Sequence, residues 1–238
     1  MEKLQPREMA AYEHIFSLML DKSVRNKYGR FSADAKRALA EVPRHNFFTQ
    51  RMLREIAKSG KSPEQAARNP MEAFFLGERS MMALPPSSAG FMSILGITQG
   101  YNVLEIGTGS GYDAALLASA VGERGHVTTL EINEYLVDHA REALRRSGIS
   151  NVTVVNENGI HGYEQNAPYD AIVVDGLGNY DPTPMLEQLR VGGKMTCTLP
   201  YWTTSSGVKV NEPIMLLEKA AEDRIVGELL VSYELDGV

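Results

Sequence analysis

The amino-acid sequence predicts an α/β protein with a mostly parallel seven-stranded sheet that ends in an antiparallel hairpin, preceded by an N-terminal helical cap. Three observations favour this fold class. A glycine-rich turn at 107–111 joins an apolar strand to a helix. Strand-like and helix-like runs then alternate, which is typical of a Rossmann-like sheet with helices on both faces. Only residues 219–224 separate the last two strand-like runs, a gap that suits a hairpin and is too short for a crossover helix.

Helical signals dominate the first part of the chain. Ser32 and Ser62 are placed as helix caps, and Gln65 completes a capping box with Ser62. This part has neither glycine-rich turns nor strand alternation. We therefore expect a helical cap and substrate region over 1–75 and a ligand-binding catalytic domain over 76–238. Apolar spacing places the helices of the cap, and the helix that leads to the first strand, at 10–19, 33–40, 52–58 and 87–95.

The second part of the chain alternates between apolar strand-like runs and amphipathic helix-like runs. Each strand of the parallel part is followed by a connection that returns the chain to the same edge of the sheet. The expected strands are 103–106, 127–131, 151–156, 169–174, 193–199, 213–218 and 226–233, and the expected helices are 112–121, 134–146 and 182–189.

The glycine turn predicts a nucleotide-like ligand. Glycines let the backbone adopt positive φ and approach a ligand closely, and the following helix presents free N–H groups. The spacing is G-x-G-x-G, whereas a dinucleotide fingerprint is G-x-G-x-x-G, and Tyr112 stands where its third glycine would be. Glu131 ends the next strand, where a carboxylate accepts hydrogen bonds from ribose hydroxyls. A glycine turn without a ligand is the weaker interpretation, because strand, helix and acid all accompany it.

Composition excludes several classes of protein and of binding site. A net charge of −6 gives no electrostatic footprint for nucleic acid. The single cysteine, Cys197, excludes an internal disulfide framework and a multi-cysteine zinc site, and we expect it to be a buried, inert thiol. The sequence has no apolar run long enough to span a membrane and no apolar segment of a signal peptide near Met1. We expect a cytoplasmic protein without a metal.

The motif E-x-G-x-G-x-G, together with the acid that ends the second strand, resembles the S-adenosylmethionine site of class I methyltransferases. The resemblance is closest to the protein-L-isoaspartate O-methyltransferase family and covers most of the chain. Its four ordered motifs are V-P-R-H-N-F at 42–47, V-L-E-I-G-T-G-S-G-Y at 103–112, A-P-Y-D-A-I at 167–172 and Q-L-R-V-G-G-K at 188–194.

This resemblance implies that S-adenosyl-L-methionine is the cofactor and S-adenosyl-L-homocysteine the product. It implies transfer of the methyl group to a carboxylate of an isoaspartyl or aspartyl residue in a protein or peptide. The implied cofactor-binding residues are Glu105, Gly107, Thr108, Gly109, Ser110, Gly111, Glu131, Ile132, Asn158 and Gly159.

The acceptor half departs from the family pattern. Where the family has G-x-G-Q-T-I-S-x-P, this chain has G-E-R-S-M-M-A-L-P at 77–85, and Ser80 is the hydroxyl that remains inside the motif. Asn158 replaces the acid that faces the adenine amino group, and its amide oxygen can still accept that bond. Asp175 follows the fourth strand, where the family usually has a small or hydroxyl residue.

Several side chains are candidates for the acceptor chemistry. A carboxylate acceptor is ionised at neutral pH and needs orienting donors, which Ser80, Arg79 or Arg44 can supply. Another acceptor needs a base, and Asp175 is the first candidate because ligands bind beyond the carboxyl ends of such strands. A turn carboxylate is the structural alternative for Asp175. The weaker candidates are His161 and His45, the aromatic pair Tyr201 and Trp202, and an apolar lid of Met81 and Met82.

Three functions remain open on this evidence. The first is a carboxyl O-methyltransferase that acts on isoaspartyl or aspartyl residues. The second is a methyltransferase of the same fold that acts on another acceptor, such as a natural-product small molecule, with Asp175 as the base. The third is a non-catalytic module that binds S-adenosylmethionine. In each case we expect neither nucleic acid nor a membrane as a partner, and the oligomeric state stays open.

Overall fold

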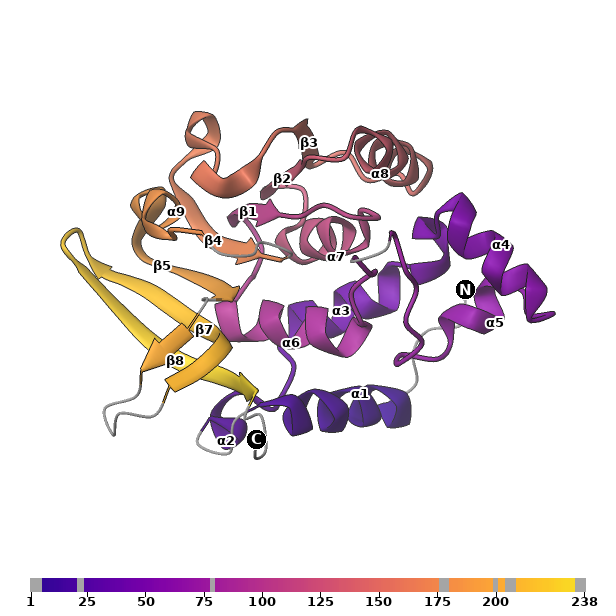
Figure 1. The fold of residues 1–238 in the computed structure, drawn as a ribbon, viewed down its shortest axis with the longest axis horizontal. Helices are drawn as coiled ribbons and strands as arrows, with labels where there is room; N and C mark the ends of the chain where they lie inside the picture. Colours follow the sequence, from indigo (N-terminus) through magenta and orange to yellow (C-terminus); the bar gives the residue numbers. More distant parts are fainter. Residues whose placement is uncertain are drawn as a thin grey trace.

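The computed structural model describes residues 6–20, 24–77, 80–175, 180–198, 201–203 and 209–233. Within these residues the strands form one eight-stranded sheet in the order β3-β2-β1-β4-β5-β7-β6, with β8 paired to β7 (Figure 1). The strands are β1 Asn102–Ile106, β2 His126–Glu131, β3 Val152–Asn156, β4 Tyr169–Val174, β5 Leu189–Thr198, β6 Tyr201–Thr203, β7 Lys209–Ala221 and β8 Arg224–Tyr233.

The sheet has the predicted mixed topology. Strand β1 pairs in parallel with β2 and β4, and β4 pairs in parallel with β5. Strand β7 then runs antiparallel to β5 and to β8, which completes the predicted hairpin. All seven expected strands are present, so the predicted fold class is confirmed. The short strand β6 is the addition, because it pairs with β7 through only three residues.

Helices cover both faces of the sheet. The helices are α1 Pro6–Met19, α2 Arg25–Tyr28, α3 Ala33–Glu41, α4 Gln50–Lys58, α5 Pro63–Ala67, α6 Pro85–Leu95, α7 Tyr112–Val121, α8 Glu134–Arg146 and α9 Thr183–Glu187. Three 3-10 turns, η1 Arg44–Phe47, η2 Gly159–His161 and η3 Glu164–Asn166, complete the described elements. Neighbouring residues of β1 point to opposite faces: Val103 packs in the cluster of α3, α6 and α7, and Leu104 packs with Met185 of α9.

The N-terminal helices pack onto the helices of the α/β part. Phe16 of α1 lies edge-on to Phe91 of α6, with ring centroids 5.6 Å apart. A Cβ atom at Gly90 would lie 2.2 Å from the Phe16 ring, so glycine permits this close approach. Arg37 of α3 donates hydrogen bonds to the carbonyl groups of Ser119 and Ala120 in α7. The two parts therefore share one core, and the division at residue 75 stays a prediction.

Both predicted serine caps are confirmed, and the helices predicted from 10, 52 and 87 begin earlier, at Pro6, Gln50 and Pro85. Ser32 accepts a hydrogen bond from Ala35 N at 3.1 Å, and Ser62 and Gln65 form the expected capping box. The helix predicted over 182–189 is shorter, because Leu189 already pairs with Tyr169 as the first residue of β5. Helix α2 and turn η1 were not predicted from the sequence. Among the described residues no helix combines the length and apolarity needed to cross a membrane.

Candidate functional site

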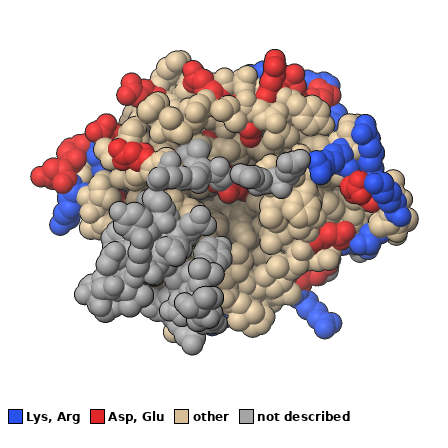
Figure 2. Space-filling view, in the orientation of Figure 1, with Lys and Arg blue, Asp and Glu red and all other residues tan. Residues whose placement is uncertain are grey.

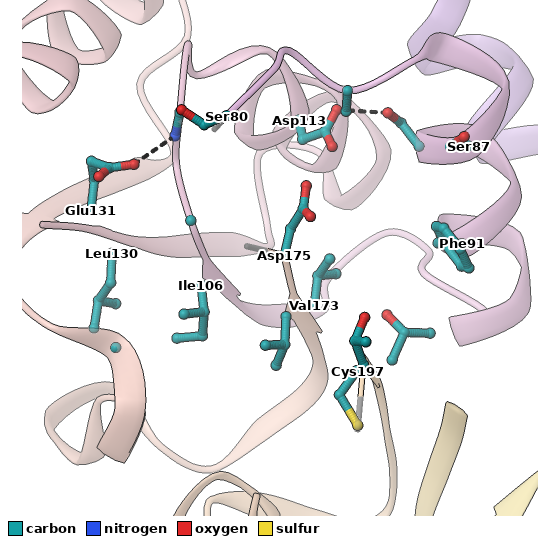
Figure 3. Close-up of a pocket in the computed structure, with 18 of the residues that line it drawn as sticks. Ser80, Ser87, Phe91, Ile106, Asp113, Leu130, Glu131, Val173, Asp175 and Cys197 are labelled. Carbon is teal, nitrogen blue, oxygen red and sulfur yellow. Dashed lines mark hydrogen bonds between the residues drawn. The ribbon is translucent and has the colours of Figure 1, made fainter. Parts of the chain in front are cut away.

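A cavity of about 700 Å³ opens beyond the carboxyl ends of β1, β2 and β4. Its lining begins at Glu131 and Asn158, passes the glycine turn and continues to Asp113, Asp175 and Phe91 (Figure 3). The parallel arrangement of these strands brings their ends to the same edge of the sheet, and loops and helices then enclose the space. Residues far apart in the sequence thus meet in one cavity.

Glycine is required at position 107 by two features. Its φ angle is +100°, and a Cβ atom would lie 2.3 Å from the carbonyl oxygen of Asp175. The backbone N–H groups of Gly107 and Thr108 donate to Leu130 O at 2.8 and 3.1 Å. These bonds fix the turn against the end of β2, so its backbone faces the cavity at close range.

Glu131 is held in place through both carboxylate oxygens. Its Oε2 accepts from Gly109 N at 3.0 Å, and its Oε1 accepts from Asn133 N at 2.9 Å. Each oxygen keeps a further lone pair, so this carboxylate can also accept bonds from the two hydroxyls of a ribose. The neighbouring Ile132 is 71% exposed and lines the same end of the cavity, where it offers an apolar surface to a flat ring.

The predicted cofactor residues divide into two groups. Gly107, Gly109, Glu131, Ile132, Asn158 and Gly159 line the cavity. The Asn158 Oδ1 atom accepts from Ile160 N at 3.2 Å, which orients its amide group at the end of β3. The other predicted residues, Glu105, Thr108, Ser110 and Gly111, do not reach the lining.

Glu105 supports the glycine turn without reaching the cavity. It is 1% exposed, and Thr129 Oγ1 donates a short hydrogen bond to it. Thr129 Oγ1 also lies 2.6 Å from Thr108 Oγ1, which links β1, β2 and the turn in one buried chain of hydrogen bonds. Burial raises the pKa of Glu105 well above its ordinary value, and the nearby Asp113 adds to the effect.

One part of the cavity wall is a short hairpin, defined by the paired residues 74–77 and 80–82. Leu76 N donates to Ser80 O at 2.9 Å, and Met82 N donates to Phe74 O at 2.8 Å. Ser80 and Met81 line the cavity, whereas Met82 is buried in the core. Of the predicted lid, only Met81 therefore contributes to the cavity wall.

Asp113 is a functional candidate that the sequence did not single out. It lies in the first turn of α7, is partly exposed and lines the cavity. Ser88 Oγ of α6 donates to its Oδ1 at 2.7 Å. In Figure 3 the Asp113 and Asp175 side chains point toward one another, away from Glu131. An acid in a first helical turn usually indicates only a favourable dipole interaction, so the sequence carried no signal for this pair.

Other candidates lie elsewhere. Arg44 is buried, and its guanidinium donates to the carbonyl groups of Asn69, Glu72 and Ala83, so it holds the chain that leads to the hairpin. Two further candidates lie outside the cavity lining, with His161 exposed and His45 4.0 Å from Glu64 Oε1. Cys197 is buried with 1% exposure, although it belongs to the cavity wall. Arg79 and the side chains of Tyr201 and Trp202 lie outside the described residues.

The described lining of the cavity is acidic. It contains Asp113, Glu131, Glu157 and Asp175, and no lysine or arginine is among its described members. Basic side chains gather at another place, on the right of Figure 2 over α4 and α5, where they alternate with acids in pairs such as Lys58 with Glu55. Among the described residues, no group of three or more His, Cys, Asp or Glu side chains is placed to hold a metal.

These residues fit S-adenosylmethionine. The Glu131 carboxylate can accept bonds from ribose hydroxyls, and Ile132 and Asn158, which line the same cavity, offer an apolar surface and an amide to an adenine ring. The acidic lining matches the positive charges of the sulfonium and ammonium groups. The cavity therefore has polar groups and a charge that suit a sulfonium cofactor.

Comparison with known proteins gives a family match over most of the chain. The family model described as Protein-L-isoaspartate(D-aspartate) O-methyltransferase matches residues 18–230. A protein-L-isoaspartate O-methyltransferase of Methanococcoides burtonii is 39% identical over 197 residues, which are 82% of this chain and 91% of that relative. A protein of the same name from Methanothermobacter thermautotrophicus is 32% identical over 192 residues, 81% of this chain and 80% of the relative.

Solved structures support the same assignment. A protein-L-isoaspartate O-methyltransferase structure superposes with a TM-score of 0.71 at 27% identity, over 94% of this chain and 64% of that chain. A Plasmodium falciparum structure in complex with S-adenosyl-L-homocysteine gives a TM-score of 0.65 at 16% identity, over 93% and 95% of the two chains, and shares the fold. The chain belongs to the protein-L-isoaspartate O-methyltransferase family, and it is a methyltransferase that uses S-adenosylmethionine.

Proposed function

We propose that this protein transfers a methyl group from S-adenosylmethionine to a carboxylate of an isoaspartyl or aspartyl residue in a protein or peptide. Relatives of that name match more than four fifths of the chain. The observation that carries the proposal is that one cavity holds both sets of residues, because its lining includes Glu131 and Asn158 as well as Ser80 of the hairpin. A cofactor and an acceptor can therefore meet within one space.

This reaction requires the protein to position the two reactants rather than to transfer a proton. The bound cofactor supplies an electrophilic methyl group, which a carboxylate oxygen takes in line as the carbon–sulfur bond breaks and the electron pair stays on sulfur. A carboxylate is already ionised at neutral pH, so no residue has to act as a base. The walls of the cavity must hold the acceptor oxygen in line and keep water out.

Ser80 is the first residue to which we assign a role. It lines the cavity, and its hydroxyl can donate to the acceptor oxygen that does not attack. Asp175 also lines the cavity, directly after β4 and beside the backbone of the glycine turn. In transfer to a carboxylate, Asp175 has no proton to remove, and we assign it to the electrostatic environment of the sulfonium group.

A second candidate function has an observation in its favour. Part of the cavity wall is apolar, with Met19, Phe91 and Val173 among its members, and the charged side chains of the described lining are acids. Such a wall also suits a small neutral acceptor, such as an amine or a hydroxyl compound. That reaction needs a base, and Asp175 is the carboxylate in position to serve.

A transfer assay separates the two candidates. The protein is incubated with methyl-labelled cofactor and an isoaspartyl peptide, with the matching aspartyl peptide as the control. We expect label in an ester that dilute alkali releases as methanol. Ser80→Ala should lower kcat/KM for the peptide by about tenfold, the worth of one hydrogen bond to a charged group. Asp175→Asn at saturating cofactor should leave kcat for the peptide within about threefold.

The opposite pattern contradicts the proposal. A product stable to alkali, formed on a neutral acceptor and lost in Asp175→Asn, would assign the second function. Binding of the cofactor without ester formation on either peptide would also exclude the proposed acceptor. The cytoplasmic location remains a proposal as well, and recovery of the native protein in a membrane or secreted fraction would contradict it.

A further inference from the structure

The pair formed by Asp113 and Ser88 has no role in the function proposed so far. Ser88 Oγ donates to Asp113 Oδ1 at 2.7 Å, and the same hydroxyl lies 3.3 Å from Leu84 O in its own helix. Among the described residues Ser88 is the one hydrogen-bond partner of this carboxyl group. This hydrogen bond joins α6 to α7, so the Asp113 side chain is held by its own helix and by Ser88. Its second oxygen is left for a group inside the cavity.

The position of Asp113 follows from the glycine turn. Helix α7 begins at Tyr112, immediately after the turn, so Asp113 stands at the end of the path that starts at Glu131. A ligand whose ribose binds Glu131 and whose chain crosses Gly107 has its far end beside Asp113. In Figure 3 Glu131 and Leu130 lie on the left of the cavity, and the two aspartates lie in the middle, between them and Phe91 on the right.

The charged groups around Asp113 favour the binding of a cation. Asp175 after β4 and Glu105 on β1 face it with the same sign, and Arg44 of η1 is the one cation that acts on it among the described residues. Arg44 is bonded to backbone carbonyl groups and does not line the cavity. Burial, with a further contribution from Asp175, raises the pKa of Asp113 to about 7, and the hydrogen bond from Ser88 opposes this rise. A positive group entering the cavity would reverse this penalty.

We infer that Asp113, held by Ser88, binds the α-ammonium group of the methionine portion of the cofactor. The cofactor carries two positive centres, the sulfonium and the ammonium group. Two aspartates of the cavity lie past the glycine turn, one for each centre. Asp175 lies against Gly107, where the sulfur must pass, and Asp113 lies one step farther along α7. The contact is a charge-assisted hydrogen bond, which is shorter and stronger than one between neutral groups.

Three ligands test this assignment without any acceptor. S-adenosylmethionine carries both positive centres, S-adenosylhomocysteine carries only the ammonium, and 5′-methylthioadenosine lacks the amino-acid portion. Calorimetric titration compares their affinities for the wild type, for Asp113→Asn and for Glu157→Gln, a control that removes a different acid of the lining. Asp113→Asn should weaken the first two ligands by about tenfold or more and leave 5′-methylthioadenosine within about twofold. Glu157→Gln should change the affinities for S-adenosylhomocysteine and 5′-methylthioadenosine by the same factor.

Two results would overturn the inference. One is an Asp113→Asn variant that binds S-adenosylhomocysteine as tightly as the wild type. The other is an equal loss for S-adenosylhomocysteine and 5′-methylthioadenosine, which would assign Asp113 to the adenosyl portion or to the fold. Retained binding of 5′-methylthioadenosine shows that the variant is folded. The inference concerns binding of the cofactor and not the identity of the acceptor. If the binding pattern is as expected but no methyl ester forms on the peptide, only the proposed function is contradicted.

Discussion

Replacing Asp113 by Asn should stabilise the protein at alkaline pH when the cofactor is absent. The folded protein holds this carboxyl group with a pKa of about 7, because it is partly buried and Asp175 lies beside it, whereas its ordinary value is 3.8. Between these values the folded state keeps a proton that the unfolded chain has released. The free energy of unfolding of the wild type must therefore fall as the pH rises from about 4 to about 7.

The size of the effect follows from the difference in pKa. The rise from 3.8 to about 7 corresponds to about 4 kcal/mol at about 1.4 kcal/mol per unit. Water in the cavity screens a partly exposed carboxylate, so we expect a gain of about 1–4 kcal/mol for Asp113→Asn above about pH 8. The amide oxygen of asparagine can still accept the bond from Ser88, so little packing is lost. At about pH 4.5 the carboxyl group is neutral in the folded wild type, so the difference in stability between the two proteins should be smaller than at the higher pH.

Urea unfolding followed by circular dichroism measures this difference. Wild type and Asp113→Asn are compared at about pH 4.5 and about pH 8.5 without cofactor. Asp175→Asn is the matched control, because it removes the neighbouring charge and should give part of the same gain. A difference between wild type and Asp113→Asn that does not change with pH would refute the reasoning. So would a loss of stability in that variant at the higher pH.

Three further substitutions test how the turn and the cap are built. Gly107→Ala should abolish S-adenosylhomocysteine binding in titration and lower stability by about 1–3 kcal/mol, because its Cβ would lie 2.3 Å from Asp175 O at a φ of +100°. Arg44→Lys should cost about 2 kcal/mol in urea unfolding, because one ammonium cannot match a guanidinium bonded to three carbonyl groups. Gly90→Ala should cost about 1–3 kcal/mol in the same assay, because its Cβ would lie 2.2 Å from the Phe16 ring.

Two matched controls belong to these substitutions. Gly60 has a φ of +73°, and a Cβ atom added there would have no atom within 4 Å, so Gly60→Ala reports the backbone strain without the clash and should bind the cofactor normally. Arg51 is exposed on α4, so Arg51→Lys should leave stability unchanged. If Arg44→Lys is as stable as Arg51→Lys, the buried arginine does not hold the hairpin as described. Normal cofactor binding in Gly107→Ala would contradict the geometry of the turn.

Local patterns in the sequence predicted the elements that position the cofactor. The helix over 112–121 follows a glycine turn and ends at Gly122, and the structure has the same bounds. Helix α8 begins after Asn133, whose side chain accepts from Leu136 N, and it too has the predicted bounds. In these segments the apolar period, the cap and the packing all favour the same structure. The short-range sequence is therefore sufficient to define them.

Other features depend on contacts between distant residues. Strand β6 is three residues long and exists because β7 provides its partner, so no local pattern could reveal it. Arg44 stands in a family motif and was one candidate donor to an acceptor, but its guanidinium donates to three carbonyl groups that lie 25 to 39 residues later in the chain. Asp113 contacts Ser88 because α6 packs against α7, and the two residues are 25 positions apart in the sequence. Long-range pairing of this kind cannot be read from periodicity or spacing.

The acidic lining links the stability of the empty protein to its cofactor. Asp113 and Glu105 both have raised pKa values, with burial as the first cause, so the unliganded fold bears the cost of holding carboxyl groups away from water. A structure optimised for stability alone would place neutral residues at these positions, as Asp113→Asn does. A ligand with two positive centres removes the cost when it binds, and the same free energy then contributes to its affinity. The substitution that stabilises the empty protein should therefore be the one that weakens the cofactor, and finding both effects in Asp113→Asn would tie them to a single carboxyl group.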